Sequence, residues 1–257
     1  MNLKSNNPIL NNKAYTKTAA TTIFDADGRP VQIVDTDNAM TVKGAINKSI
    51  ISLILLIASA AVVWNLALSG MNVFPLIIGG AITAFIVVIV AVRKVNYAHF
   101  LVPAYAILKG LFLGGASVIF EYMYSGIVLQ AIGGTLVTAL VCFLLYKFKV
   151  VKVTEQFKSV VIASTLAIAT YYVISFVLSM VFGIHLFHHD NSLMSIGFSV
   201  FVIVIAALNL FLDFDMIEQG AKRKLPKNME WLSAMALMIT LVWLYFEILR
   251  LLAKLND

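Results

Sequence analysis

The chain has few charged residues and a single cysteine. Charged side chains make up 12% of its 257 residues, whereas hydrophobic ones make up 61%. A soluble domain carries about 25% charged and about 45–50% apolar residues, so this composition excludes an ordinary soluble protein. The one cysteine, Cys142, leaves no disulfide and no cysteine-based metal site within one chain.

Common enzyme motifs are also missing. The sequence has no Walker loop, no Gly-x-Ser-x-Gly and no His-Glu-x-x-His. We therefore expect no enzymatic activity and no cofactor. The net charge of +6 does not indicate nucleic-acid binding, because no base-stacking motif accompanies the basic residues.

Long apolar runs dominate what is present. A transmembrane helix needs about 20 apolar residues to cross a hydrocarbon core about 30 Å thick. Seven runs qualify: Ser49–Leu68, Phe74–Val92, Phe100–Phe120, Ile127–Tyr146, Val160–Phe182, Leu193–Leu212 and Trp231–Leu252. The predicted fold is an all-α integral membrane protein, with a polar, flexible tail at 1–46 and a seven-helix bundle at 47–255. Within the tail, Thr21–Phe24 and Val31–Val34 can pair as a hairpin.

Basic residues predict the orientation of this bundle. Lys and Arg occur in the tail and in the second, fourth and sixth loops, and they are absent from the odd-numbered loops. Because cytoplasmic loops carry the excess of basic residues, the N-terminus is predicted to be cytoplasmic. Arg250 and Lys254 run against this rule, and a short or re-entrant seventh segment would remove the conflict. With no cleavable signal and short loops, we expect a bacterial inner membrane, with the lipid bilayer as partner.

Asp213 is the first candidate for function. Carboxylates in or near hydrocarbon are costly and usually mark an ion path, a proton relay or a sensor. Asn209 lies one turn before it, so both can face the same side of the helix, whereas Asp215 lies about 200° around the helix from it. If the sixth helix continues to a stop at Gly220, Asp213 lies more than a turn inside it. The alternative is that Asp213 and Asp215 are both solvated at the cytoplasmic interface.

Glu247 is the second candidate. Arg250 follows it by three residues and can pair with it directly, while Thr240 precedes it by seven on nearly the same face. Glu247 is therefore either half of a local ion pair or part of an outer gate. We expect the seventh helix to begin at Pro226. At 1.5 Å per residue, Thr240 lies about 13 Å and Glu247 about 24 Å beyond Trp231 along this helix. A direct pair of Asp213 and Glu247 is not expected.

Two further groups carry titratable side chains. Lys109 is the one basic residue clearly inside a span, and we expect it to be a counter-ion to Asp213 or Glu247. His185, His188, His189 and Asp190 form a cluster in the fifth loop. A zinc or copper site needs a third ligand that is not evident there, so a solvated, titrating surface is favoured.

Several stretches resemble the bacterial branch of the Bax inhibitor-1 family. They are Ser5–Pro8, Tyr105–Gly115, Ser125–Ala131, Leu212–Gly220, Met229–Trp231 and Leu241–Leu252. The resemblance extends from about Lys48 to the C-terminus, and the C-terminal stretches are the most specific.

The resemblance implies a seven-helix bundle with the seventh helix central, and a pH-sensitive calcium leak linked to stress or cell-death regulation. The family's ion site is a pair of aspartates on the sixth and seventh helices. Asp213 matches the first position, whereas Thr240 stands at the second, counted back from Arg250. Lys109 stands where relatives often carry a glutamate. Both departures lower the negative field that a divalent cation needs.

Two functions remain open. The first is a cation leak channel or transporter, with calcium or protons as the ion, gated by protonation of Asp213. The second is a regulator without transport, whose tail and basic loops bind a membrane protease or another channel.

Overall fold

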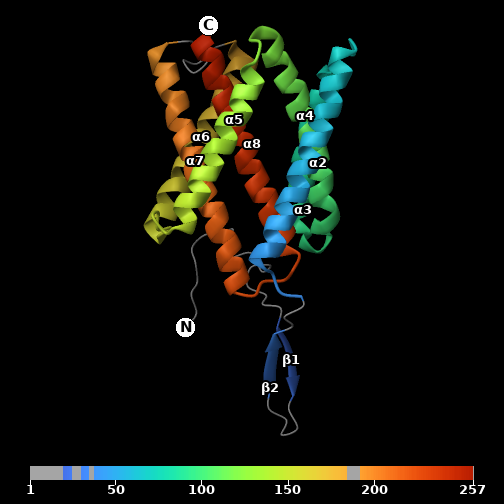
Figure 1. Cartoon of the computed structure of the whole chain (residues 1–257), viewed down its shortest axis with the longest axis vertical. Coiled ribbons are helices and arrows are strands. Elements are labelled where there is room, and N and C mark those ends of the chain that lie inside the picture. The colour runs from blue at the N-terminus through green and yellow to red at the C-terminus, as the bar shows by residue number, and fades with distance from the viewer. Residues whose placement is uncertain (1–19, 25–29, 35–37, 184–191, 257) are drawn as a thin grey trace.

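The computed structural model describes residues 20–24, 30–34, 38–183 and 192–256. This part of the chain contains seven long helices, all long and apolar enough to cross a membrane (Figure 1). They are α2 (Val42–Leu68), α3 (Phe74–Arg93), α4 (Ala98–Met123), α5 (Ile127–Lys147), α6 (Glu155–Phe182), α7 (Leu193–Lys222) and α8 (Met229–Asn256). A 3₁₀ turn, η1 (Val95–Tyr97), joins α3 to α4. The predicted seven-span helical bundle is confirmed.

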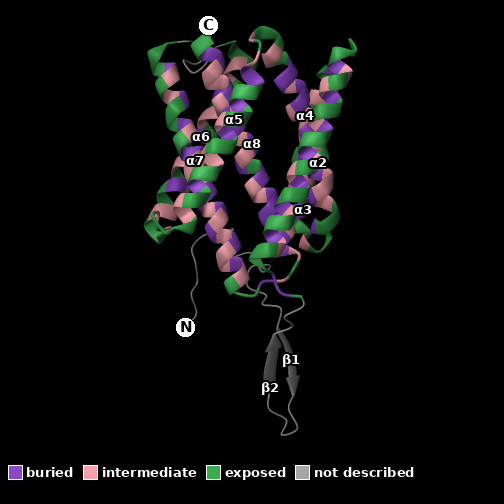
Figure 2. Ribbon diagram, in the orientation of Figure 1, coloured by how far each residue is buried: buried purple, intermediate pink, exposed green. Residues whose placement is uncertain are grey.

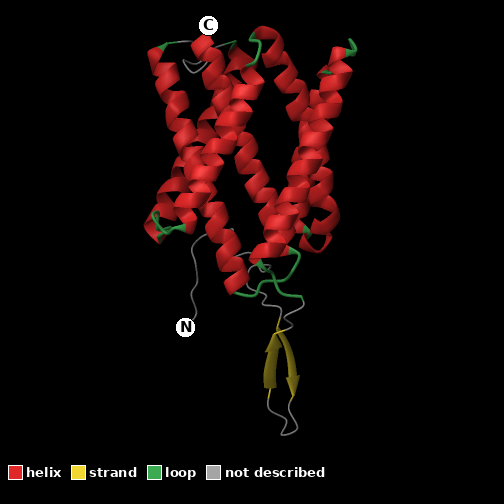
Figure 3. Cartoon of the chain, viewed as in Figure 1, coloured by secondary structure: helices red, strands yellow, loops and turns green. Residues whose placement is uncertain are grey.

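A short hairpin precedes the bundle (Figure 3). Strands β1 (Ala20–Phe24) and β2 (Pro30–Val34) pair antiparallel, with Ala20 opposite Val34 and Phe24 opposite Pro30. The predicted pairing within the tail is therefore confirmed. The predicted flexibility of the rest of the tail concerns residues that lie mostly outside the described ranges, as does the histidine cluster at 185–190.

Helix α8 lies at the centre of the bundle. It contacts α2 and α4 on one side and α5 and α7 on the other, and α6 packs on α7. More of α8 is buried than of any other span, as Figure 2 shows by its colouring. A seventh helix that forms the core agrees with the expectation from the resemblance. It also means that polar groups on α8 are held inside protein.

The ends of three helices differ from the prediction. Helix α2 begins at Val42, seven residues before the predicted Ser49, because Thr41 caps it by accepting a hydrogen bond from Gly44 N at 2.9 Å. Helix α7, the sixth span, does not stop at Gly220, so the predicted stop at this residue was wrong. Gly220 lies inside the helix against Met40, whose Sδ would be 2.8 Å from an added Cβ.

Helix α8 begins at Met229 instead of Pro226, so that prediction was also wrong. Pro226 forms an isolated antiparallel bridge with Ala39, in the segment that leads into α2. The backbone of the α7–α8 loop is thus paired with the start of the membrane domain, and α8 can begin only after this pairing ends.

Small residues bring α2 and α4 close together. An added Cβ at Gly114 would lie 2.5 Å from Ala60 O, and one at Gly110 would overlap Ser59 Oγ. Gly133 on α5, by contrast, has no atom within 4 Å of an added Cβ. Gly110 and Gly114 therefore serve helix packing, because without a side chain the two backbones can approach.

We predict that Gly114→Val lowers the stability of the protein in detergent by about 1–3 kcal/mol, since the new side chain must push α4 away from α2. Thermal unfolding followed by tryptophan fluorescence measures the change. Gly133→Val is the matched control, because it makes the same substitution in a helix at an open position. Equal losses of stability in the two variants would contradict this account of the packing.

Candidate functional site

Asp213 lies inside α7, nine residues before the last helical residue, Lys222. Its side chain is buried, and its Oδ2 has no hydrogen-bond partner among the described residues. Thr240 on α8 faces it at hydrogen-bonding range. The Thr240 hydroxyl also lies 3.3 Å from Ala236 O, so its one proton can go to either acceptor. The solvated alternative for Asp213 is therefore wrong, because the extended helix places it within protein.

The two polar neighbours of Asp213 on α7 face α6 instead. Asp215 forms an ion pair with Lys158 Nζ at 2.9 Å. The Asn209 amide donates to Thr165 Oγ1 at 2.8 Å and to Ile205 O at 2.8 Å. Asp213 and Asp215 therefore lie on different faces, as their spacing predicts, whereas Asn209 does not share the contact of Asp213 with α8. Asp215 is compensated by a lysine, and Asn209 joins α7 to α6.

Glu247 is fully buried and fully paired. Its carboxylate accepts hydrogen bonds from Tyr172 OH at 3.0 and 3.2 Å and from Trp243 Nε1 at 3.2 Å. Arg250 Nη1 lies 3.3 Å from both of its oxygens and donates to Tyr172 OH at 2.9 Å. The predicted pair of Glu247 and Arg250 is present, and Tyr172 extends it from α8 to α6.

Lys109 does not take the predicted place of a counter-ion. In the part of the chain that the structure describes, it forms no ion pair with Asp213 or Glu247. Its Nζ lies 4.7 Å from the centre of the Phe112 ring, one turn along α4. A cation over an aromatic face gains some of the stabilisation that a carboxylate would give.

The sequence that forms this bundle matches a known family. A family model described as Bax inhibitor 1 like matches residues 7–257, nearly the whole chain. The chain belongs to the Bax inhibitor-1-like family. A search of curated proteins found no match. The structure brings together the side chains of Asp213 and Thr240, the two positions that the resemblance names in the sequence analysis.

The basic residues at the end of α8 have partners within the Bax inhibitor-1-like bundle, with Lys254 buried and Arg250 partly exposed. Lys254 donates to Ser199 Oγ at 2.8 Å and to Ser195 O at 3.4 Å, both on α7, while Arg250 pairs with Glu247. Helix α8 continues to Asn256, so a re-entrant segment does not explain these two cations. Their contacts with neighbouring helices explain how they are accommodated.

Glu230 is a buried carboxylate that the sequence did not single out. It forms an ion pair with Lys48 on α2, and its Oε1 accepts from Thr41 N at 2.8 Å and Thr41 Oγ1 at 3.0 Å. A negative charge at the first turn of α2 is favourable, because that end of a helix carries partial positive charge. The sequence does show an acidic residue next to Trp231 at the start of a span, which could have marked Glu230 as a candidate. It does not show that Lys48 and Thr41 are its partners.

The segment Asn38–Thr41, which we call the strap, is held on the α7–α8 loop by backbone hydrogen bonds. Met40 N donates to Leu225 O at 2.6 Å, and Lys227 N donates to Asn38 O at 2.9 Å. The Met40 side chain is buried against Gly220. The strap and Glu230 together tie the start of α2 to the ends of α7 and α8.

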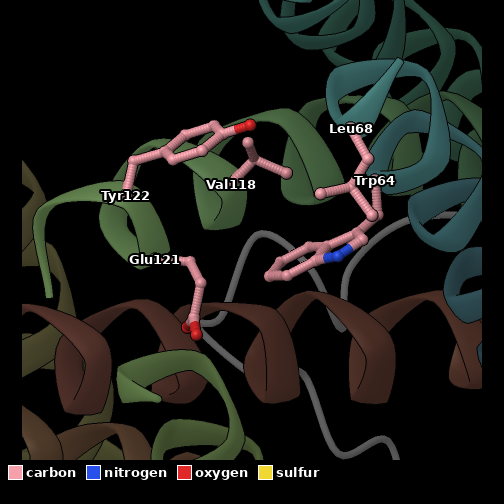
Figure 4. A pocket seen from close by; sticks show the side chains of 5 residues that line it. All are labelled: Trp64, Leu68, Val118, Glu121 and Tyr122. Atoms are coloured by element: carbon pink, nitrogen blue, oxygen red, sulfur yellow. The ribbon is translucent and has the colours of Figure 1, made fainter. Parts of the chain in front are cut away.

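Two further carboxylates of the spans, Glu218 and Glu121, also accept hydrogen bonds. Glu218 on α7 accepts from Tyr146 OH and from Lys222 Nζ, each at 2.5 Å. Glu121 lines a small pocket between α2 and α4 with Trp64, Leu68, Val118 and Tyr122 (Figure 4). Its carboxylate accepts from Gly126 N at 2.6 Å and Val128 N at 3.1 Å, so it caps the start of α5. No cluster of three or more His, Cys, Asp or Glu side chains that could hold a metal occurs among the residues described.

We predict that Glu230→Gln lowers the stability of the purified protein by about 2–4 kcal/mol, because it leaves Lys48 without a charged partner at a largely buried position. Asp213→Asn should cause no loss, since it removes a buried charge that has no compensating cation. Thermal unfolding of the two variants in the same detergent gives the comparison. A larger loss for Asp213→Asn than for Glu230→Gln would mean that Asp213 has a partner that these contacts lack.

Proposed function

We propose that this protein is a pH-sensitive cation leak channel or transporter whose path passes between α7 and α8 at Asp213. The observation that carries the proposal is a buried carboxylate with one oxygen that has no partner. Such a group is costly inside a membrane protein, so it usually marks transport, proton transfer or sensing. Asp213 lies where α7 packs on the central helix α8, and these two helices can separate at this level.

The sign of the pH dependence follows from the charge of Asp213. When Asp213 is protonated, it is neutral and its hydroxyl can donate to Thr240 Oγ1, so the contact between α7 and α8 is satisfied. When Asp213 is ionised, it can still accept a hydrogen bond from Thr240, but its charge has no cation partner and needs water or an ion, which favours separation of the two helices at this level. We therefore expect the path to be closed at low pH and to open as pH rises.

Other ionisable groups on α7 and on the helices packed against it have their own partners or lie apart from Asp213. On α7 they are Asp215, Glu218 and Lys222; on α2, Lys43 and Lys48; on α5, Cys142, Tyr146 and Lys147; on α6, Glu155, Lys158, Tyr171 and Tyr172; on α8, Glu230, Tyr245, Glu247, Arg250 and Lys254. No ion pair joins any of them to Asp213 within the described ranges. The gate is thus assigned to one carboxyl group.

Family membership supports calcium as the first ion to test, with protons as the second. The same proposal sets the N-terminus in the cytoplasm, because the loops at the end of the bundle near the hairpin carry the basic residues. The membrane we propose is the bacterial inner membrane.

We predict that flux into liposomes holding the purified protein rises between pH 6 and pH 8 and that Asp213→Asn removes this rise. The asparagine keeps the size of the side chain but cannot ionise, so the path stays closed. Ion-sensitive dyes inside the liposomes measure the flux. Glu155→Gln is the matched control, since the Glu155 side chain is 87% exposed and should leave the pH profile unchanged. A pH profile that survives in Asp213→Asn would remove Asp213 from the gate.

A regulator without transport is the second candidate, and the strap favours it. A tail fixed to the α7–α8 loop could pass the binding of a membrane protease or another channel to the central helix. Removal of residues 1–37 leaves the strap in place and separates the two functions. A leak predicts that the shortened protein still conducts in liposomes. A regulator predicts no flux from the full-length or the shortened protein. It also predicts that the regulatory effect of the protein in cells is lost when the tail is removed.

A further inference from the structure

Helices α7 and α8 together carry five carboxylates, and four of them are neutralised. The four pairs are Asp215 with Lys158 at 2.9 Å, Glu218 with Lys222 at 2.5 Å, Glu247 with Arg250 at 3.3 Å, and Glu230 with Lys48. Asp213 is the fifth, and it forms no ion pair with any described residue. Within the described helices, the proposed path thus offers a passing ion one uncompensated negative charge.

The groups around Asp213 add no further negative charge. Thr240 faces it with a neutral hydroxyl. In the described ranges every other carboxylate of α7 and α8 has a cation partner, so the negative charge at this site is that of a single carboxylate.

The charge of the ion decides how well this site can hold it. A divalent cation beside one carboxylate leaves a net positive charge in a region of low dielectric, and Ca²⁺ in addition takes 6–8 oxygen ligands, usually from several carboxylates. A monovalent cation beside the same carboxylate forms a neutral pair. One carboxylate with one facing hydroxyl matches the second case.

From this charge balance we infer that the path at Asp213 carries a monovalent cation and excludes calcium. The inference rests on the proposed function, since it names the class of ion for the same path. A proton, sodium or potassium supplies the single positive charge, and flux measurements tell these sources apart.

The test compares four gradients across liposomes that hold the full-length protein: calcium, sodium, potassium and protons, each read with its own dye at pH 8. We expect flux of at least one monovalent cation, lost in Asp213→Asn, and calcium flux no greater than in empty liposomes. A proton gradient that collapses without added sodium or potassium identifies the proton. Flux that needs one of the two metal ions identifies that ion.

A second variant restores the missing charge. Thr240→Asp places a second carboxylate opposite Asp213 and should produce calcium flux that the wild type lacks. Thr240→Asn, which has nearly the same size but no charge, is the matched control and should not. If Thr240→Asp fails to fold, as judged by size-exclusion chromatography, the comparison of ions in the wild type still decides the matter.

The outcomes separate this inference from the function on which it rests. Calcium flux in the wild type that Asp213→Asn abolishes would overturn the monovalent assignment and leave the leak intact. Monovalent flux that Asp213→Asn does not change would overturn the assignment of the ion to this carboxylate. Absence of flux for every cation, with folded protein, would overturn the leak itself and the assignment with it.

Discussion

The compensation of buried charge is the constraint on which the rest of this bundle depends. A carboxylate that leaves water for a helical bundle in a membrane needs a cation or several hydrogen bonds, or it remains a source of instability. Glu247 has an arginine, a tyrosine and a tryptophan around it, and Glu230 has a lysine and a helix start. Measured against these two, Asp213 with its one unpartnered oxygen is the exception.

The position of α8 turns these local pairs into connections across the whole bundle. Glu230 at one end of α8 contacts α2, and Glu247 nearer the other end contacts Tyr172 on α6. Lys254 then contacts α7. The central helix is thus fixed at both ends by polar contacts, and Thr240, which faces Asp213 on α7, lies in the stretch between them. A change of contact at Asp213 can therefore act on α8 while both its ends stay in place.

Contacts within one helix or at a fixed spacing could be predicted from the sequence, whereas contacts between distant segments could not. The spans follow from apolar length, and Glu247 with Arg250 follows from their spacing of three residues. The match of Asp213 with Thr240 came from the family pattern. Glu230 and Lys48 are 182 residues apart, and no periodicity joins them. The continuation of α7 past Gly220 was missed because the reason for the glycine, Met40, lies in another segment.

The strap makes the first helix depend on the last one during synthesis. Thr41 leaves the ribosome 189 residues before Glu230, the residue that accepts its hydrogen bonds. At about 5–20 residues per second, the start of α2 waits roughly 10–40 seconds for its partner. Throughout that interval Lys48 lacks Glu230, its partner in the folded protein. The membrane domain is therefore completed only when α8 has been inserted, and a chain that ends before α8 lacks the carboxylate that holds the start of α2.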